Sequence, residues 1–254
     1  MFQGVLGATV CVFCATHLMA PHSFQHGQKQ KKMAQTLDKQ AIYTCMTRIR
    51  SFCADNGLAN PVLVAATKSQ PTKTILLAHE AGVTDVGENY VQEAQEKAAQ
   101  GAYAGLRLHF IGRFQSNKAR EVARLFDVVH SLDKASSADK LDKACAQESK
   151  TMDVFIQVYL GTAREGRSGT TPEELGELVQ HIRKLRHLNL VGLMCMPATD
   201  DPCPQESFRS VRQLGETLGL RQFSMGMSGD WQDALLAGAT HIRLGTVLFG
   251  SRTK

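Results

Sequence analysis

Short apolar runs alternate with amphipathic segments along most of the chain. The run from Val62 to Ala66, followed by Thr67 and Lys68, is typical of a short strand that is buried on both faces. Before it, the segment from Thr36 to Asn56 has apolar residues at helical spacing and ends at an Asn-Gly pair. This pattern predicts a helix ahead of the first strand.

The same alternation continues to the end of the chain. Further strands are expected at Asp85–Asn89, Leu106–Gly112, Val128–Leu132, Asp153–Leu160, Leu188–Pro197, Gln222–Met225 and His241–Leu244. Helices are expected at Thr72–Ala81, Val91–Ala99, Ser116–Leu125, Ser136–Gln147, Pro172–Leu185, Gln205–Leu218 and Asp230–Ala237.

Strands that alternate with helices imply a parallel sheet. Eight such units in about 220 residues match the size of a closed barrel. The sequence therefore predicts a single (β/α)8 TIM barrel preceded by a helix, with a doubly wound open sheet as the alternative. No linker or change of composition divides residues 33–254, so we expect one domain there.

The first 32 residues do not fit this pattern. Residues 1–28 contain no Asp, Glu, Lys or Arg, and Lys29, Lys31 and Lys32 follow them. A secretory signal needs a positive segment before its apolar stretch, and a mitochondrial presequence needs arginines. Residues 1–28 have no Lys or Arg, so neither pattern is met. We expect residues 1–32 to be an N-terminal extension that is either disordered or a targeting or anchoring segment.

Composition narrows the class of protein. The chain has 43% hydrophobic and 21% charged residues, as an ordinary globular protein does. This composition excludes a disordered chain, a collagen-like fibre and a polytopic membrane protein. The net charge of +5 comes from scattered basic residues, and aromatic residues make up only 6%, so a nucleic-acid partner is not favoured. Seven cysteines without paired spacing suggest reduced thiols and a cytoplasmic location, with mitochondrial or membrane-anchored alternatives through residues 1–32.

Candidate chemistry is sought at the C-terminal ends of the strands, where barrels of this type place their sites. Lys68 follows the first strand. A partly desolvated ammonium loses its proton more easily, and the resulting amine can attack an aldehyde to form a Schiff base. The alternative is an ordinary lysine at the barrel rim.

Two glycine-containing loops follow the seventh and eighth predicted strands, at Ser224-Met-Gly-Met-Ser228 and Arg243-Leu-Gly-Thr246. Barrels commonly bind phosphate at this position, and glycine lets the backbone approach an anion closely. Ser228 is predicted to cap the helix that opens at Asp230. The alternative is plain turn chemistry with Arg243 bonded to a carboxylate.

The histidines and cysteines show no metal-binding spacing, so no metal site is expected. His109 and His241 fall within predicted strands and are interpreted as buried core or rim residues rather than as ligands.

Five motifs occur along the predicted barrel: Val64-Ala-Ala-Thr-Lys68, Val86-Gly-Glu-Asn-Tyr-Val-Gln-Glu93, His109-Phe-Ile-Gly112 with Gln115-Ser-Asn-Lys118, Ser224-Met-Gly-Met-Ser228 and Arg243-Leu-Gly-Thr-Val-Leu-Phe-Gly250. Together they resemble the pyridoxal phosphate homeostasis protein family, also called the proline synthase co-transcribed family. The similarity extends from about Leu37 to Arg252, with the motifs in order and at family spacing.

The resemblance implies a barrel like the N-terminal domain of alanine racemase that holds pyridoxal 5′-phosphate (PLP) as an aldimine on Lys68. It implies that Asn89 flanks the cofactor and that Arg243 reaches its phosphate or its pyridine nitrogen. The phosphate would be surrounded by Ser224, Gly226, Ser228, Gly245 and Thr246. No catalytic residue is assigned.

The family resemblance also implies a role in vitamin B6 homeostasis. We expect a protein that buffers PLP and delivers it to apo-enzymes without turnover, as a monomer or weak homodimer. The alternative is a PLP-dependent amino-acid racemase. That activity would need a tyrosine from an additional β domain, which we do not expect here because the sequence ends two residues after Arg252.

Overall fold

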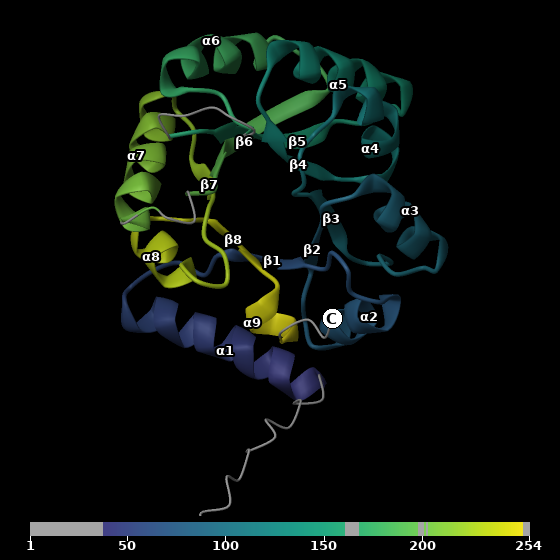
Figure 1. The fold of residues 1–254 in the computed structure, drawn as a ribbon, viewed down its shortest axis with the longest axis vertical. Coiled ribbons are helices and arrows are strands. Elements are labelled where there is room, and N and C mark those ends of the chain that lie inside the picture. Colours follow the sequence, from purple (N-terminus) through teal and green to yellow (C-terminus); the bar gives the residue numbers. More distant parts are fainter. Residues whose placement is uncertain (1–37, 161–167, 198–200, 202, 251–254) are drawn as a thin grey trace, which may run out of the picture. The chain divides into compact units, whose positions relative to one another are not determined.

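The computed structural model describes residues 38–160, 168–197, 201 and 203–250. Its eight parallel strands pair in chain order, and β8 pairs with β1 to close a barrel (Figure 1). The strands are β1 (Val62–Ala66), β2 (Asp85–Glu88), β3 (Arg107–Phe110), β4 (Val128–Leu132), β5 (Met152–Val158), β6 (Leu188–Cys195), β7 (Gln222–Ser224) and β8 (His241–Leu244). The predicted TIM barrel is confirmed, and the open-sheet alternative is wrong.

Helices form an outer ring around the strands (Figure 1). They are α1 (Lys39–Asp55), α2 (Thr72–Glu80), α3 (Val91–Ala99), α4 (Ala119–Leu125), α5 (Ala135–Gln147), α6 (Pro172–Ile182), α7 (Pro204–Thr217), α8 (Trp231–Leu236) and α9 (Thr246–Phe249). The predicted helix from Ser116 begins as a 3-10 turn at Ser116–Lys118. The sequence did not predict α9, because a single helical turn is too short to show a period.

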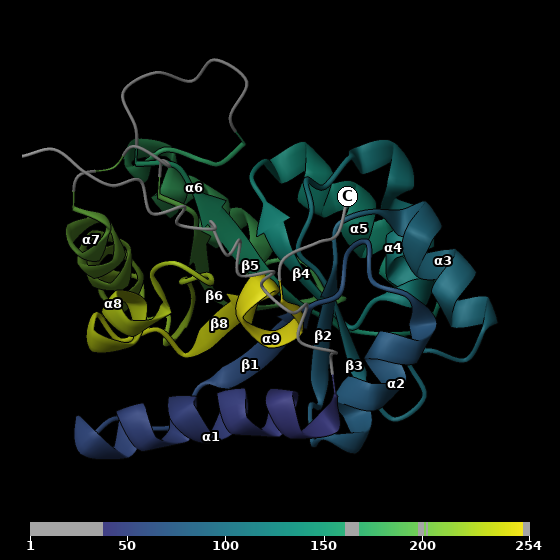
Figure 2. The same ribbon diagram turned by 60° about the horizontal axis from the view of Figure 1, so that its bottom comes forward.

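Helix α1 completes the ring on the outer side of β1 (Figures 1 and 2). Phe52 of α1 meets Trp231 of α8 edge to face, with ring centroids 5.1 Å apart. The Arg48 guanidinium lies over the same indole, 6.0 Å from its centroid. The helix before the first strand is therefore an integral part of the barrel wall.

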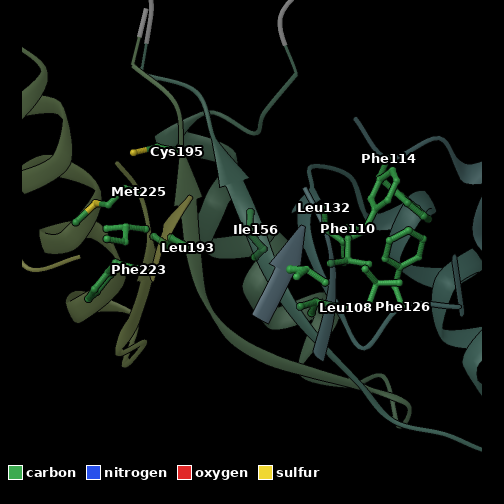
Figure 3. Packing of buried hydrophobic residues seen from close by; sticks show 14 of the residues in the cluster. Leu108, Phe110, Phe114, Phe126, Leu132, Ile156, Leu193, Cys195, Phe223 and Met225 are labelled. Carbon is green, nitrogen blue, oxygen red and sulfur yellow. The ribbon is translucent and has the colours of Figure 1, made fainter. Parts of the chain in front are cut away.

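The main hydrophobic core lies between the strands and this ring of helices. Figure 3 shows Phe110, Phe114 and Phe126 packed together on one side of it. The Phe110 ring meets Phe126 at 5.1 Å and Phe114 at 6.3 Å, both edge to face. This packing fixes the end of β3 against α4.

The barrel interior has a much smaller apolar cluster, formed by Val128, Phe155 and Met194. Polar and charged side chains are buried among the strands as well: His109, His130, Gln157, Ser224, His241 and Arg243. The interpretation of His109 and His241 as buried residues is confirmed. Buried polar groups require partners, so these side chains constrain one another.

The extension predicted at residues 1–32 lies outside the described residues. Across the part of the chain that the structure describes, no helix has the length and apolarity needed to cross a membrane.

Gly192 sets how closely β6 and β7 approach. A Cβ at this position would lie 1.8 Å from the carbonyl oxygen of Gln222 on β7. Gly192→Ala should therefore lower the free energy of unfolding by about 1–3 kcal/mol or more, measured by urea denaturation. Gly176→Ala is the matched control, because nothing lies within 4 Å of its added Cβ in α6. That variant should be neutral or stabilised by about 0.5–1 kcal/mol; equal losses in both variants would contradict the account.

Candidate functional site

A cavity of about 310 Å³ opens at the C-terminal ends of the strands. Lys68 enters it from the end of β1, Asn89 from the end of β2 and Arg243 from β8. The full lining is Ala66, Lys68, Gln70, Asn89, Ile111, Met196, Met227, Ser228, Gly229, Arg243, Gly245, Thr246 and Gly250. Its size is at the lower end of the range for small-molecule sites.

The cavity contains six of the eight residues predicted to bind the cofactor: Lys68, Asn89, Ser228, Arg243, Gly245 and Thr246. Ser224 and Gly226 are not part of its lining. Ser224 is fully buried and accepts a hydrogen bond from Arg243. Gly226 has a φ of +91°, and a Cβ there would lie 2.5 Å from the Cβ of Ala234 in α8. These two residues therefore support the cavity from behind.

The Arg243 guanidinium is buried beside the cavity, at 5% exposure. It donates hydrogen bonds to the Ser224 hydroxyl at 2.6 Å and to the Cys195 carbonyl at 3.0 Å. Within the described ranges it forms no ion pair with a carboxylate, so the alternative that Arg243 is a charge-paired turn residue is not supported. Burial lowers the pKa of the guanidinium from its usual value, but arginine stays charged.

The backbone on both sides of Lys68 is held by charged side chains from α3. Lys97 donates to the carbonyl oxygen of Thr67 at 2.9 Å. Glu93 accepts the amide hydrogen of Ser69 at 2.5 Å. Ser69 has a φ of +60°, which an L-residue adopts only under constraint. The position of Lys68 is thus fixed by its neighbours on either side.

Lys97 and Glu93 belong to a buried ionic cluster centred on Glu88, which is fully buried. One Glu88 oxygen accepts hydrogen bonds from Thr67 (2.7 Å), Lys97 (2.7 Å) and Tyr103 (3.0 Å). Lys97 also pairs with Glu93 at 2.6 Å. Burial, together with the charge of Glu88, raises the pKa of Tyr103 far above its usual value. Its hydroxyl therefore stays protonated and acts as a donor.

We missed the roles of Lys97, Glu93 and Tyr103 in the sequence. One signal was available: Lys97 falls on the same face of its helix as Val91 and Ala94, and all three are buried. A lysine on an apolar face suggests a buried ion pair, but the partner on β2 becomes visible only in the fold.

Asn89 is positioned by a close approach of two loops. A Cβ at Gly112 would lie 2.0 Å from the carbonyl oxygen of Asn89. The side-chain oxygen of Asn89 is buried and has no hydrogen-bond partner in the described structure. Buried acceptors without partners are uncommon, so this oxygen is suited to accept a hydrogen bond from a ligand.

The predicted cap at Ser228 is wrong. Helix α8 begins at Trp231, its N-cap is Asp230, and no side chain caps it. Instead, the Ser228 hydroxyl accepts the amide hydrogen of Val247 at 3.3 Å. The short helix α9, which the sequence did not reveal, supplies this competing donor.

The Glu88 cluster gives a stability prediction. Lys97→Met would leave the buried Glu88 charge without its cation, which typically costs about 3–5 kcal/mol. The double variant Glu88→Leu with Lys97→Met should recover part of that loss, measured by urea unfolding, although it leaves the Thr67 and Tyr103 hydroxyls without their Glu88 acceptor. Lys118→Met, which breaks a half-exposed pair with Glu121, should cost less than about 1 kcal/mol. A double variant as unstable as Lys97→Met alone would contradict the prediction.

Known proteins match most of the chain. The family model for the alanine racemase N-terminal domain matches residues 37–253. The pyridoxal phosphate homeostasis protein of Haemophilus influenzae is 42% identical over 218 residues, covering 81% of this chain and 92% of the relative. The protein of the same name from Pseudomonas aeruginosa is 39% identical over 194 residues, covering 75% and 84%.

Solved structures with the same fold include a relative from the same family. PipY of Synechococcus elongatus, in a structure with PLP bound, has a TM-score of 0.73 at 31% identity, covering 82% of this chain and 100% of that one. Alanine racemase of Clostridium difficile has a TM-score of 0.67 at 15% identity, covering 86% of this chain and 58% of that one. The latter similarity concerns the fold alone. With the matches to the homeostasis proteins spanning most of both sequences, the chain belongs to the pyridoxal phosphate homeostasis protein family.

Proposed function

We propose that the chain binds PLP in the cavity at the C-terminal end of the barrel, with Lys68 as the covalent attachment point, and takes part in vitamin B6 homeostasis. The observation that carries this proposal is the buried Arg243 cation, which has no carboxylate partner among the described residues and shares its cavity with Lys68. A buried charge is costly without a counter-charge. An anionic ligand would supply one.

The donor and acceptor groups of the cavity fit PLP. Guanidinium groups bind phosphate and other anionic oxygens strongly. Asn89 offers a buried acceptor without a partner, and Gly245 and Thr246 bring backbone to the same wall. Ser224 and Gly226 are proposed to support this wall, and Ser228 and Thr246 to offer hydroxyl groups. When bound, PLP supplies an aldehyde that condenses with a primary amine, and Lys68 is the primary amine in this lining.

The names of the relatives support a homeostasis role. The curated relatives are called pyridoxal phosphate homeostasis proteins, and one solved relative holds PLP. We infer that this chain likewise holds PLP and releases it to apo-enzymes.

The lining also favours a carrier over a racemase. Racemisation requires a proton donor or acceptor on each face of the substrate. Among the described residues that line the cavity, only Lys68 and Arg243 are ionisable, and arginine is too basic to exchange a proton readily. None of the four tyrosines is in this lining, and Tyr103 is engaged with Glu88. We therefore propose that the protein does not turn over amino acids.

Borohydride reduction of the PLP-loaded protein, followed by peptide mass mapping, tests the attachment point. The reduced adduct should lie on Lys68 and be absent from Lys68→Ala, while the exposed Lys73→Ala serves as the control and keeps it. The fold should survive in both variants, because Lys68 lies at the rim of the barrel and is only half-buried.

An adduct of wild-type yield in Lys68→Ala would show that the attachment point is elsewhere. The loaded wild-type protein should racemise alanine no faster than Lys68→Ala does. Sustained racemisation that depends on Lys68 would favour the enzyme alternative.

A further inference from the structure

A chain of hydrogen bonds crosses the barrel interior and ends at Arg243. The Asp85 carboxylate contacts His109 Nε2 at 2.9 Å, and His109 Nδ1 contacts His130 Nε2 at 2.8 Å. His130 Nδ1 contacts the Ser224 hydroxyl at 2.7 Å, and Ser224 accepts from Arg243 at 2.6 Å. We call Asp85, His109, His130, Ser224 and Arg243 the buried chain.

The two ends of the buried chain lie in different cavities. Arg243 lines the proposed PLP cavity. Asp85 is the first residue of β2 and lines a second cavity, of about 320 Å³, between α1 and the N-terminal ends of β1 and β2. His109, His130 and Ser224 between them are fully buried. The chain therefore connects the two ends of the barrel through its interior.

One assignment of hydrogens satisfies every member of the buried chain. Arginine can only donate, so the Ser224 oxygen accepts from it, and we assign the single hydrogen of the Ser224 hydroxyl to the bond with His130 Nδ1. His130 must then carry its proton on Nε2 and donate it to His109 Nδ1.

His109 in turn carries its proton on Nε2 and donates it to Asp85. Burial alone would raise the pKa of Asp85, but hydrogen bonds donated by His109 and Thr84 bring it below its usual value, so Asp85 is ionised and acts as an acceptor. All members are satisfied with both imidazoles neutral.

The surroundings keep His130 neutral. Burial is the main cause that lowers the pKa of His130, and a positive charge on His109, Arg243, His241 or Arg107 acts in the same direction. His130 stacks on Phe155 at 4.5 Å between ring centroids, and His241 meets the same phenyl ring from another side at 5.1 Å. Burial lowers the pKa of His241 to about 4, so this neighbour is neutral as well.

We propose that Asp85, His109 and His130 are positioning residues for Arg243, which they act on through Ser224. The buried chain has the positive charge of Arg243 at one end, the negative charge of Asp85 at the other and neutral groups between them. Because each donor has one acceptor, the Ser224 lone pair is directed at Arg243 and holds its guanidinium toward the PLP cavity. This inference rests on the proposed function for its effect on PLP, but the geometry of the chain can be tested without ligand.

Two variants separate the charge of Asp85 from the continuity of the chain. Asp85→Asn keeps an acceptor for His109 and removes the charge, whereas His130→Phe interrupts the chain at its centre and retains a ring to stack on Phe155. Asp153→Asn is the matched control. Asp153 lies near the start of β5, pairs with Arg107, accepts a hydrogen bond from Asn189 and is not part of the buried chain. Thermal unfolding shows which variants fold.

The first measurement uses ligand-free protein. Nitrogen NMR of labelled histidine should show both His109 and His130 as neutral Nε2–H tautomers at pH 7. The rotation of the Arg243 guanidinium, followed by NMR, should be slow in the wild type and in Asp153→Asn, several-fold faster in His130→Phe, and faster by a smaller factor in Asp85→Asn. Protons on Nδ1, or unchanged rotation in the folded variants, would overturn the positioning role.

The second measurement is the dissociation constant for PLP, followed by absorbance. Loss of one oriented hydrogen bond should weaken binding by about fivefold to tenfold in His130→Phe, less in Asp85→Asn, and not in Asp153→Asn. Wild-type affinity in both chain variants would overturn the proposal. If the wild-type protein fails to bind PLP, the proposed function fails, while the guanidinium rotation still decides whether the chain positions Arg243. If His130→Phe does not fold, Asp85→Asn carries both measurements.

Discussion

The burial of the Arg243 guanidinium without a carboxylate partner in the described structure is the constraint on which the site depends. Removing a charge from water costs several kcal/mol unless another charge and good hydrogen bonds offset it. The protein supplies two acceptors for the guanidinium, the Ser224 hydroxyl and the Cys195 carbonyl, and leaves its remaining donors beside an open cavity. We infer that the ligand supplies the missing counter-charge. The buried cation therefore lowers the stability of the ligand-free protein and raises its affinity for the ligand.

Closure of the barrel brings this cation to Lys68. The two residues are far apart in the chain, but β1 and β8 are paired, with Val64 opposite Arg243. In an open sheet that followed the chain order, these strands would be the two edges and the residues could not share a cavity. The α3 side chains Glu93 and Lys97 then fix the backbone around Lys68. The seam of the barrel and one neighbouring helix thus determine where the amine and the cation lie.

Much of this arrangement follows from sequence patterns. The apolar run of β1, the alternation of strands and helices and the glycine loops after β7 and β8 each reflect a local rule. Those rules sufficed for the fold and for five residues of the cavity, and the family resemblance added Asn89. The buried contacts did not follow. Ser228 has a cap-like position, yet it bonds Val247 across a long sequence separation. His109 and His130 are ordinary strand residues until the barrel brings their rings within hydrogen-bond distance.

The most direct test of this account is calorimetric unfolding of the wild type and of Arg243→Gln, each with and without PLP. Because the variant removes an unpaired buried charge, its apo form should unfold at the wild-type temperature or above. At a PLP concentration about 100-fold above the dissociation constant, the wild type should gain roughly 5–10 °C, and the variant should gain much less. An apo variant that unfolds at a much lower temperature yet keeps the full PLP-induced shift would contradict the claim that Arg243 is held for the ligand.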